Sequence, residues 1–399
     1  ASEVEYRSAG LAPSRQAHRS RRYPMMRYPW DRTEAALRAM ADKFANVLHG
    51  QGVKKGDRVL LYMQNSPQYV IGYYAILRAD AVVIPVNPMN RHAELEHYIA
   101  DTSATLCLAG QELASFIVPL IGETNLEQVV VASYNTYINL ETDLNLPAEV
   151  AAPAWSKEIP GVVSWDTAMA SGHKPSEHTA QPDDLAVIPY SSGTTGAPKG
   201  CMHTHRSVMA TALHRAFWNL STPDTVQLST LPFFHVTGMT GSMNSPIYSG
   251  STSVIMTRWD RTTAAKLIER YKVTGWTNIV TMAVDFLSNP DIGNYDLSSL
   301  NTIGGGGAAM PEAVAKKLKA MTGLDYIEGY GLSDGYSLWG CQVGDFPVLE
   351  LDLRQWCGVC GAVDQVHDLC DLSVDPWKPV GCREPVARNA VFGARPLSL

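Results

Sequence analysis

The sequence of 399 residues lacks the features that mark several special classes of protein. Charged residues make up only 18% of it and the net charge is −7, so it does not show the excess of Lys and Arg that binding to nucleic-acid phosphates requires. No apolar run approaches the roughly 18 residues of a membrane-spanning helix; Tyr69 to Leu77 is about as long as such runs get. An apolar secretory signal is also lacking at the N-terminus. We therefore expect a cytoplasmic protein without a transmembrane segment, disulfides or a nucleic-acid partner.

Apolar residues make up 45% of the chain, which is typical of a globular protein, and its length predicts two or three packed units. Residues 1–32 form a basic arm, because Tyr6 to Trp30 contains no acidic residue and six arginines. Such a composition occurs in organelle transit peptides, although a poorly ordered arm or a gene-model artefact is the favoured interpretation.

Hydrophobic periodicity after this arm predicts helices and strands in alternation, which is typical of parallel sheets covered on both faces. Residues 146–160 are predicted to be a surface connection, because they are rich in Pro and Ala. The predicted helices are 33–50, 67–79, 93–101, 205–219, 262–271 and 311–321, and the predicted strands are 58–63, 82–86, 105–109, 129–132, 185–190, 226–229, 252–256, 276–279 and 300–303.

The most informative segment is residues 190–200, Tyr-Ser-Ser-Gly-Thr-Thr-Gly-Ala-Pro-Lys-Gly, which directly follows a predicted strand. Its glycines let main-chain amides approach phosphate oxygens, its hydroxyls donate hydrogen bonds, and Lys199 adds a positive charge. It is not the P-loop of NTPases, because Pro198 precedes the lysine and Gly200 follows it. The alternative is a flexible polar surface loop.

Three later segments carry further candidates. His235 lies in Pro-Phe-Phe-His-Val-Thr-Gly at 232–238, where a packed core histidine is the alternative. Residues 304–311, Gly-Gly-Gly-Gly-Ala-Ala-Met-Pro, predict a turn whose bare backbone accepts a flat base, or else merely a strand-to-helix turn. Residues 329–334 read Gly-Tyr-Gly-Leu-Ser-Asp.

The loop at 190–200 resembles the signature loop of the adenylate-forming (AMP-binding) superfamily, which includes acyl-CoA synthetases, and the three later segments agree with it in order and approximate spacing. The resemblance covers roughly residues 33–334. It implies an α/β fold of two stacked α/β subdomains with mostly parallel sheets, as in the large domain of acyl-CoA synthetases. The implied division is a basic arm at 1–32, subdomains at 33–180 and 181–335, and an atypical cysteine-rich tail at 336–399.

The resemblance also implies roles for individual residues. ATP would be held by its phosphates at the loop and by its adenine at the glycine turn, with Tyr330 stacked on the base. Ser333 would bond the α-phosphate, while Ser191 and Asp334 would hold Mg²⁺. Relatives usually carry Thr and Glu at the last two positions; Asp334 is one methylene shorter than Glu, so its carboxylate extends less far towards the metal. The implied catalytic residues are His235, Ser333 and Asp334; the implied ATP-binding residues are Ser191, Ser192, Gly193, Thr194, Thr195, Gly196, Lys199, Gly306, Gly307, Ala308, Gly329, Tyr330 and Gly331.

Enzymes of this kind join a carboxylate to AMP, release pyrophosphate and pass the acyl group to the thiol of coenzyme A. The nucleophile is already ionised, so catalysis reduces to placement and charge stabilisation. Overall likeness, including Pro85 to Pro88 and the run from Trp276 to Leu287, favours a fatty acid as substrate. The sequence leaves the oligomeric state open.

The last part of the chain departs from the resemblance. Relatives continue with a ribose-binding aspartate, a hinge and a small C-terminal domain that carries a lysine, and none of these is found in the 65 residues after Asp334. Five of the seven cysteines lie there, and Cys357, Cys360, His367 and Cys370 allow a zinc site as a weak alternative. A shifted reading frame or aberrant splice is the favoured explanation, and a divergent tail is the alternative. We therefore expect an impaired enzyme, or alternatively an inactive nucleotide- or acyl-binding remnant.

Overall fold

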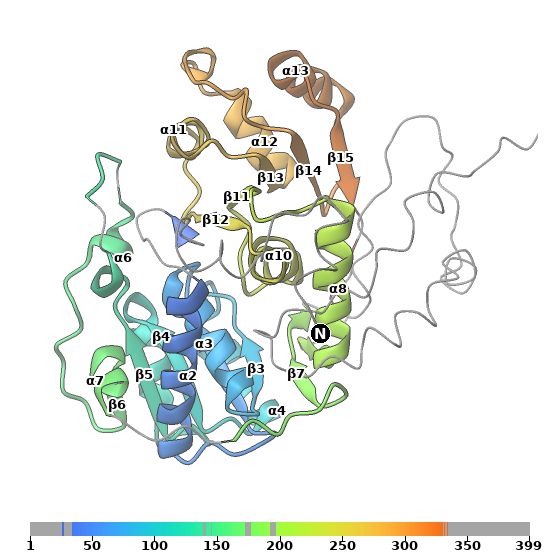
Figure 1. Cartoon of the computed structure of the whole chain (residues 1–399). Helices are drawn as coiled ribbons and strands as arrows, with labels where there is room; N and C mark the ends of the chain where they lie inside the picture. The colour runs from blue at the N-terminus through green and yellow to red at the C-terminus, as the bar shows by residue number, and fades with distance from the viewer. Residues whose placement is uncertain are drawn as a thin grey trace, which may run out of the picture. The chain divides into compact units, whose positions relative to one another are not determined.

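The computed structural model describes residues 26–27, 34–138, 141–144, 146–171, 177–191, 197–329, 331 and 333 (Figure 1). All of them belong to the first of two compact units, which spans residues 1–350. Most of the basic arm, the cysteine-rich tail and the zinc alternative lie outside the described residues. No helix within the described ranges is long and apolar enough to cross a membrane.

A seven-stranded sheet is built from the first part of the chain, in the order β10-β7-β3-β2-β4-β5-β6. Neighbouring strands are parallel except β10 and β7, which are antiparallel. Every residue of β3 and β4 is buried, as expected for parallel strands that are covered on both faces. The strands are β2 (Arg58–Tyr62), β3 (Val82–Pro85), β4 (Leu106–Gly110), β5 (Gln128–Ala132), β6 (Val162–Ser164), β7 (Leu185–Val187) and β10 (His203–Thr204).

Helices cover this sheet on both faces. On one face α2 (Glu34–Gly50) packs along α3 (Pro67–Arg78), as Figure 1 shows, and α7 (Trp165–Ala170) packs against α2. On the other face α4 (His92–Thr102) and α5 (Ala114–Ile117) bury apolar side chains in the same core as β2, β3 and β4. Helix α3 begins sharply, because Ser66 caps its N-terminus and Pro67 occupies a first-turn position that needs no amide hydrogen.

A six-stranded parallel sheet follows, in the order β1-β12-β11-β13-β14-β15. Its core includes Trp276 on β13 and Phe286 on α12, whose ring centroids lie 4.9 Å apart. The strands are β1 (Met26–Arg27), β11 (Val226–Ser229), β12 (Thr252–Ile255), β13 (Gly275–Asn278), β14 (Thr302–Gly306) and β15 (Tyr326–Gly329). The helices are α8 (His205–Trp218), α9 (Val236–Gly238), the π-helix η4 (Met239–Asn244), α10 (Ser245–Ser249), α11 (Arg261–Tyr271), α12 (Val280–Leu287) and α13 (Glu312–Thr322).

The predicted fold class, α/β with mostly parallel sheets, is confirmed. Three local predictions differ from the structure. The strand predicted at 300–303 lies at 302–306, and the predicted connection at 146–160 contains the short helix α6 (Ala148–Ala151). Strands β7 and β10 belong to the first sheet, although residue 181 was the predicted start of the second subdomain. The six-stranded sheet takes no strand from residues 181–225 that the structure describes.

Candidate functional site

The two ends of the predicted phosphate loop form a short hairpin. Strands β8 (Tyr190–Ser191) and β9 (Lys199–Gly200) pair antiparallel, with Ser191 opposite Lys199. Lys199 is exposed, so its ammonium group is open to a ligand. The structure therefore brings Ser191 and Lys199 together, as the prediction requires. Ser192, Gly193, Thr194, Thr195 and Gly196 lie outside the described residues.

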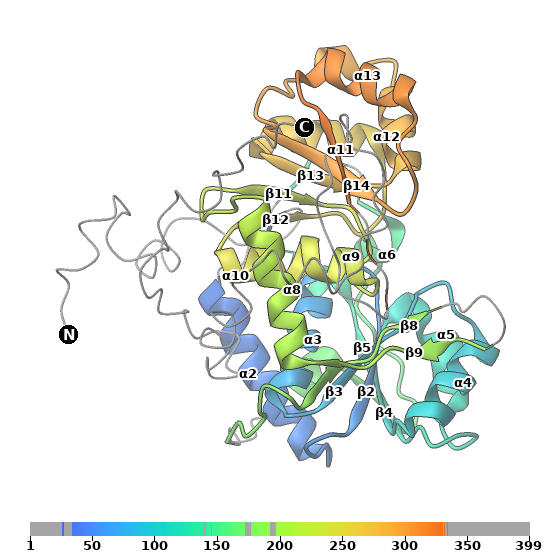
Figure 2. The ribbon, with the colours of Figure 1, turned by 90° about the vertical axis from the view of Figure 1, so that its right-hand side faces the viewer.

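Aromatic stacking fastens this hairpin to helix α4, and Figure 2 shows β8 and β9 beside that helix. The ring of Tyr190 stacks on Tyr98 with centroids 4.1 Å apart, and its hydroxyl donates to the Asp101 carboxylate. Burial and the neighbouring carboxylate of Asp101 raise the pKa of Tyr190, so the phenol stays a donor. His97 Nε2 lies 2.9 Å from the carbonyl oxygen of Pro198. Contacts with α4 therefore hold the chain at both ends of the loop.

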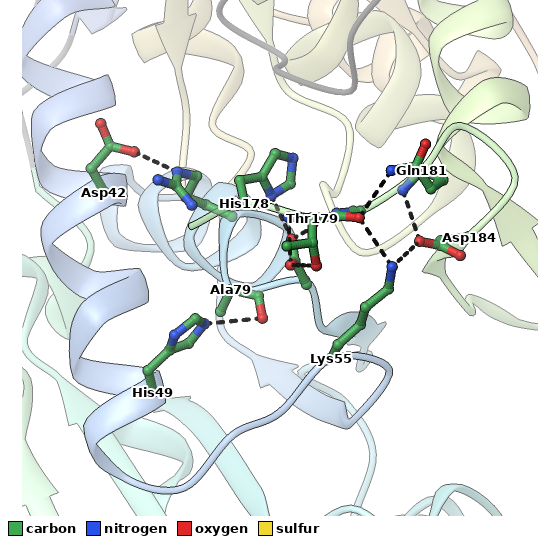
Figure 3. A network of polar contacts seen from close by, with 11 residues as sticks. Asp42, His49, Lys55, Ala79, His178, Thr179, Gln181 and Asp184 are labelled. Carbon is green, nitrogen blue, oxygen red and sulfur yellow. Dashed lines mark hydrogen bonds and ion pairs between the residues drawn. The ribbon is translucent and has the colours of Figure 1, made fainter. Parts of the chain in front are cut away.

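Strand β7, which leads into the hairpin, is anchored at its start by a polar network (Figure 3). The Asp80 carboxylate accepts hydrogen bonds from Thr179 N at 2.8 Å, Thr179 Oγ1 at 2.7 Å and Ala180 N at 3.2 Å, and lies 2.5 Å from His178 Nδ1. Burial alone would raise the pKa of Asp80, but these hydrogen bonds and the charge of His178 outweigh it and lower the pKa. Lys55 pairs with Asp184 at 2.7 Å on the other side of the segment.

Ser333 lies next to the strand that follows the hairpin. His203 Nε2 on β10 lies 2.7 Å from the carbonyl oxygen of Ser333, although the two residues are 130 positions apart. The structure thus places Ser333 near the chain that leaves the phosphate hairpin. Tyr330 and Asp334 lie outside the described residues.

The glycine run at 304–307 is not a turn as predicted. Gly304, Gly305 and Gly306 belong to strand β14, and only Gly307, with φ +85°, begins the turn. Close packing explains the difference: a β-carbon on Gly305 would lie 1.8 Å from the carbonyl oxygen of Asn278, and one on Gly306 would lie 2.2 Å from that of Gly329. These glycines let neighbouring strands approach.

Gly306 and Gly329 are paired in register on β14 and β15, so two predicted ATP-binding positions lie side by side. Bare backbone at the ends of both strands offers a surface on which a flat base can rest. The turn after Gly307, which includes Ala308, is tied to β15 because Met310 N donates to the Glu328 carboxylate.

His235 follows strand β11 and caps the short helix α9. Its Nδ1 accepts a hydrogen bond from Thr237 N at 3.3 Å, which places the proton of the neutral ring on Nε2. The side chain is exposed, yet partial burial by the surrounding protein disfavours the charged form and lowers the pKa of His235. Near neutral pH it therefore presents an uncharged N–H donor rather than a cation.

These segments gather at one edge because they follow parallel strands of one sheet. His235 comes after β11, Gly307 after β14 and Ser333 after β15. The chain runs from β11 to β12 on one side and then crosses to β13 on the other side of β11, so the strand order reverses between β11 and β13. Ligands of open α/β sheets bind at the carboxyl edge, beside such a reversal.

Sequence reasoning missed one residue that reaches this edge. The amide of Asn65, three positions after β2, bonds the backbone of Leu231 and Phe233, which lead to His235. The signal that could have found it is a polar pair, Asn65 and Ser66, directly after a buried strand. Among the described residues, no group of three or more His, Cys, Asp or Glu side chains is arranged to hold a metal, and the predicted metal ligand Asp334 is not among those residues.

Comparison with known proteins gives the same family as the motifs. Residues 14–356 match the family described as AMP-binding enzyme. The chain is 32% identical over 305 residues to a long-chain-fatty-acid–CoA ligase of Bacillus subtilis, covering 73% of this chain and 53% of the relative. It is 29% identical over 299 residues to the corresponding ligase of an Escherichia coli strain, with the same coverage. The chain thus spans about half the length of the curated relatives it matches.

Solved structures share the fold. A long-chain-fatty-acid–CoA ligase from Archaeoglobus fulgidus superposes with a TM-score of 0.65 at 26% identity, over 80% of this chain and 61% of the other. An anthranilate CoA ligase in complex with anthranoyl-AMP superposes with a TM-score of 0.70 at 23% identity, over 81% and 59%, which shows the fold alone.

Proposed function

The chain belongs to the AMP-binding enzyme family, and from this premise we propose that it activates a carboxylic acid with ATP to an acyl adenylate and then to an acyl-CoA thioester. The observation that carries the proposal is that His235, the glycine strand ends and Ser333, which come from distant parts of the sequence, follow parallel strands of one sheet. The contact between His203 and Ser333 supports a phosphate hairpin close to the same edge.

ATP would lie along the carboxyl edge of the six-stranded sheet. Its base would rest on the backbone around Gly306 and Gly329, and its β- and γ-phosphates would reach the hairpin and Lys199. Mg²⁺ would accompany the nucleotide, with Ser191 and Asp334 as ligands, and would neutralise charge on the phosphate oxygens.

The first step needs no general base. A carboxylate oxygen attacks the α-phosphorus, and the bond to pyrophosphate breaks. His235 suits a positioning role here, since its Nε2–H donates a hydrogen bond to a carboxylate without the charge that would trap the acid as a tight ion pair. The Ser333 hydroxyl would bond the α-phosphate.

A fatty acid is the proposed substrate class. Its support is the identity with long-chain-fatty-acid–CoA ligases. Coenzyme A would be the acyl acceptor, and we place the reaction in the cytoplasm, where ATP and coenzyme A are supplied.

Isotope exchange between pyrophosphate and ATP tests this proposal, because exchange requires reversible formation of the adenylate. We expect exchange that depends on added palmitate and Mg²⁺ and that is lost in Lys199→Ala. Calorimetry with ATP on the same samples separates the two ways of failing. ATP binding without palmitate-dependent exchange would identify a nucleotide-binding protein instead of a ligase, and absence of both would refute the proposed site.

A further inference from the structure

Asn65 joins the first sheet to the start of the His235 segment. It lies between β2 and α3, and its side chain is held by three backbone groups that follow strands of the second sheet. Oδ1 accepts from Phe233 N at 2.8 Å, while Nδ2 donates to Leu231 O at 2.9 Å and to Met256 O at 3.4 Å. Its own carbonyl oxygen accepts from Thr257 Oγ1 at 3.0 Å.

The geometry of these bonds is selective. Asn65 is only 6% exposed, so water does not replace a partner that is lost. An amide supplies one acceptor and two donors, and here it meets one N–H and two carbonyl oxygens that follow β11 and β12. Aspartate would have the same shape but would present an oxygen to both carbonyls. The site therefore requires the amide itself.

The backbone at 231–233, which Asn65 holds, is connected to His235 by a short and tightly packed stretch of chain. His235 N donates to Pro232 O at 3.2 Å, and Met239 N donates to His235 O at 2.8 Å. A β-carbon on Gly238 would lie 2.1 Å from Pro232 O, so this stretch has little room to rearrange. The ring of Phe233 is fully buried beside Tyr69, with centroids 5.7 Å apart.

We propose that Asn65 is a positioning residue of the acid-activating site: it fixes the backbone of residues 231–233 and thereby sets where the Nε2–H of His235 meets the substrate carboxylate. This inference rests on the proposed function, because it assigns the held segment to the acid rather than to the nucleotide. It deepens that proposal by predicting that Asn65 affects binding of the acyl group and leaves binding of ATP alone.

The test compares Asn65→Ala with Gln68→Ala in the whole chain. Gln68 is the matched control, because it is a fully buried amide three positions away on α3 whose Nε2 donates to Ser133 O at 2.9 Å, just after β5 of the first sheet. The probes are ATP and 5′-O-(palmitoylsulfamoyl)adenosine, a stable mimic of an acyl adenylate, both measured by calorimetry. The histidine Cε1–H resonance of His235, assigned with His235→Gln, is titrated in each protein.

We expect Asn65→Ala to weaken binding of the acyl mimic about 10-fold or more, since small displacements of positioning groups cost about that much. ATP affinity should stay within about 2-fold, and the His235 resonance should move and titrate at higher pH as the ring becomes more hydrated. Gln68→Ala should change neither. If Asn65→Ala does not fold, Asn65→Ser, which keeps one hydroxyl donor, carries the same comparison with a smaller effect.

Two negative results have different meanings. If the wild-type chain binds the mimic and both asparagine variants bind it equally well with an unmoved His235 resonance, the role of Asn65 is refuted and the proposed function stands. If the wild-type chain binds ATP but does not bind the mimic, the proposed function fails and the role of Asn65 falls with it.

Discussion

Glu112 provides a sharp test of the electrostatics at the carboxyl edge of the first sheet. It lies two positions after β4, and its Oε1 accepts a hydrogen bond from the hydroxyl of Tyr134 at 3.1 Å. Its Oε2 is buried and has no hydrogen-bond partner among the described residues. Burial, with a smaller contribution from the Glu149 carboxylate, raises the pKa of Glu112 to about 7, against the opposing hydrogen bond from Tyr134.

The sign and size of the effect follow from this raised pKa. Because the folded state binds the proton more tightly than the unfolded state, stability is fully present below the ordinary pKa of 4.5 and is lost as the pH rises through about 7. A tenfold change in proton affinity corresponds to about 1.4 kcal/mol, so the charged carboxylate costs about 3 kcal/mol at pH 8. Glu112→Gln keeps the shape and the bond from Tyr134 but never ionises. It should therefore become progressively more stable than wild type as the pH rises.

Urea unfolding of both proteins at pH 5, 6, 7 and 8 measures this prediction. The difference in free energy of unfolding between Glu112→Gln and wild type should grow by about 2.5 kcal/mol in favour of the variant between pH 5 and pH 8. Glu123→Gln supplies the control, because it removes a carboxylate that is exposed instead of buried. If the difference between Glu112→Gln and wild type is the same at pH 5 and pH 8, burial does not disfavour the charged form of Glu112 and the prediction is wrong.

Three further predictions concern other sites. Burial, and to a smaller extent the charge of His178, lowers the pKa of His205 to about 4. The contribution of this group to stability is therefore full above about pH 6.5 and falls by about 3 kcal/mol as the pH is lowered towards 4. His205→Gln should remove that loss, as measured by urea unfolding at pH 5. Gly305→Ala should destabilise by several kcal/mol in thermal unfolding because its β-carbon would overlap backbone, whereas Gly293→Ala, with open space around it, should not. Lys199→Ala should weaken ATP binding about 10-fold by calorimetry, and unchanged affinity would remove this lysine from the site.

The elements with a strong local pattern were predicted well from sequence. Apolar spacing predicted a helix at 33–50, and α2 spans Glu34–Gly50; the helix predicted at 205–219 is α8, His205–Trp218. Runs of buried Val, Ile and Leu gave β2, β3 and β5 to within a residue or two, because a strand covered on both faces needs apolar side chains on both. In these places local pattern and burial agree.

Features that depend on distant contacts were not predicted. A strand was predicted at 185–190, but nothing local shows that the three-residue strand β7 pairs with β3 rather than with a later strand. The π-helix Met239–Asn244 is likewise set by surroundings, because the Asn244 amide meets the hydroxyls of Tyr73 and Tyr74 on α3. Glycine is depleted in strands, so a run of glycines favours a turn. A turn was therefore predicted where Gly304 to Gly306 form a strand.

The candidate site divides along the same line. Short motifs were enough to predict candidate ATP-binding residues, because a phosphate hairpin and a glycine strand end are local arrangements. The roles of these residues stay predictions. What the motifs did not contain is the means of holding them in register. The contact from His203 to Ser333 and the bonds from Asn65 to Leu231 and Phe233 join residues more than a hundred positions apart.

A buried amide whose partners are all backbone groups leaves little trace in composition, because its specificity depends on geometry and not on the residue types it meets. The contribution of Asn65 to stability also depends on these partners. If Asn65 is shortened, two carbonyl oxygens and one N–H stay buried without a hydrogen-bond partner, and each such loss costs about 1–3 kcal/mol. That cost falls on the backbone between β11 and His235, which the sequence alone showed only as an aromatic-histidine motif. The residue that fixes a motif in space is therefore as much a part of the site as the motif, and only the fold identifies it.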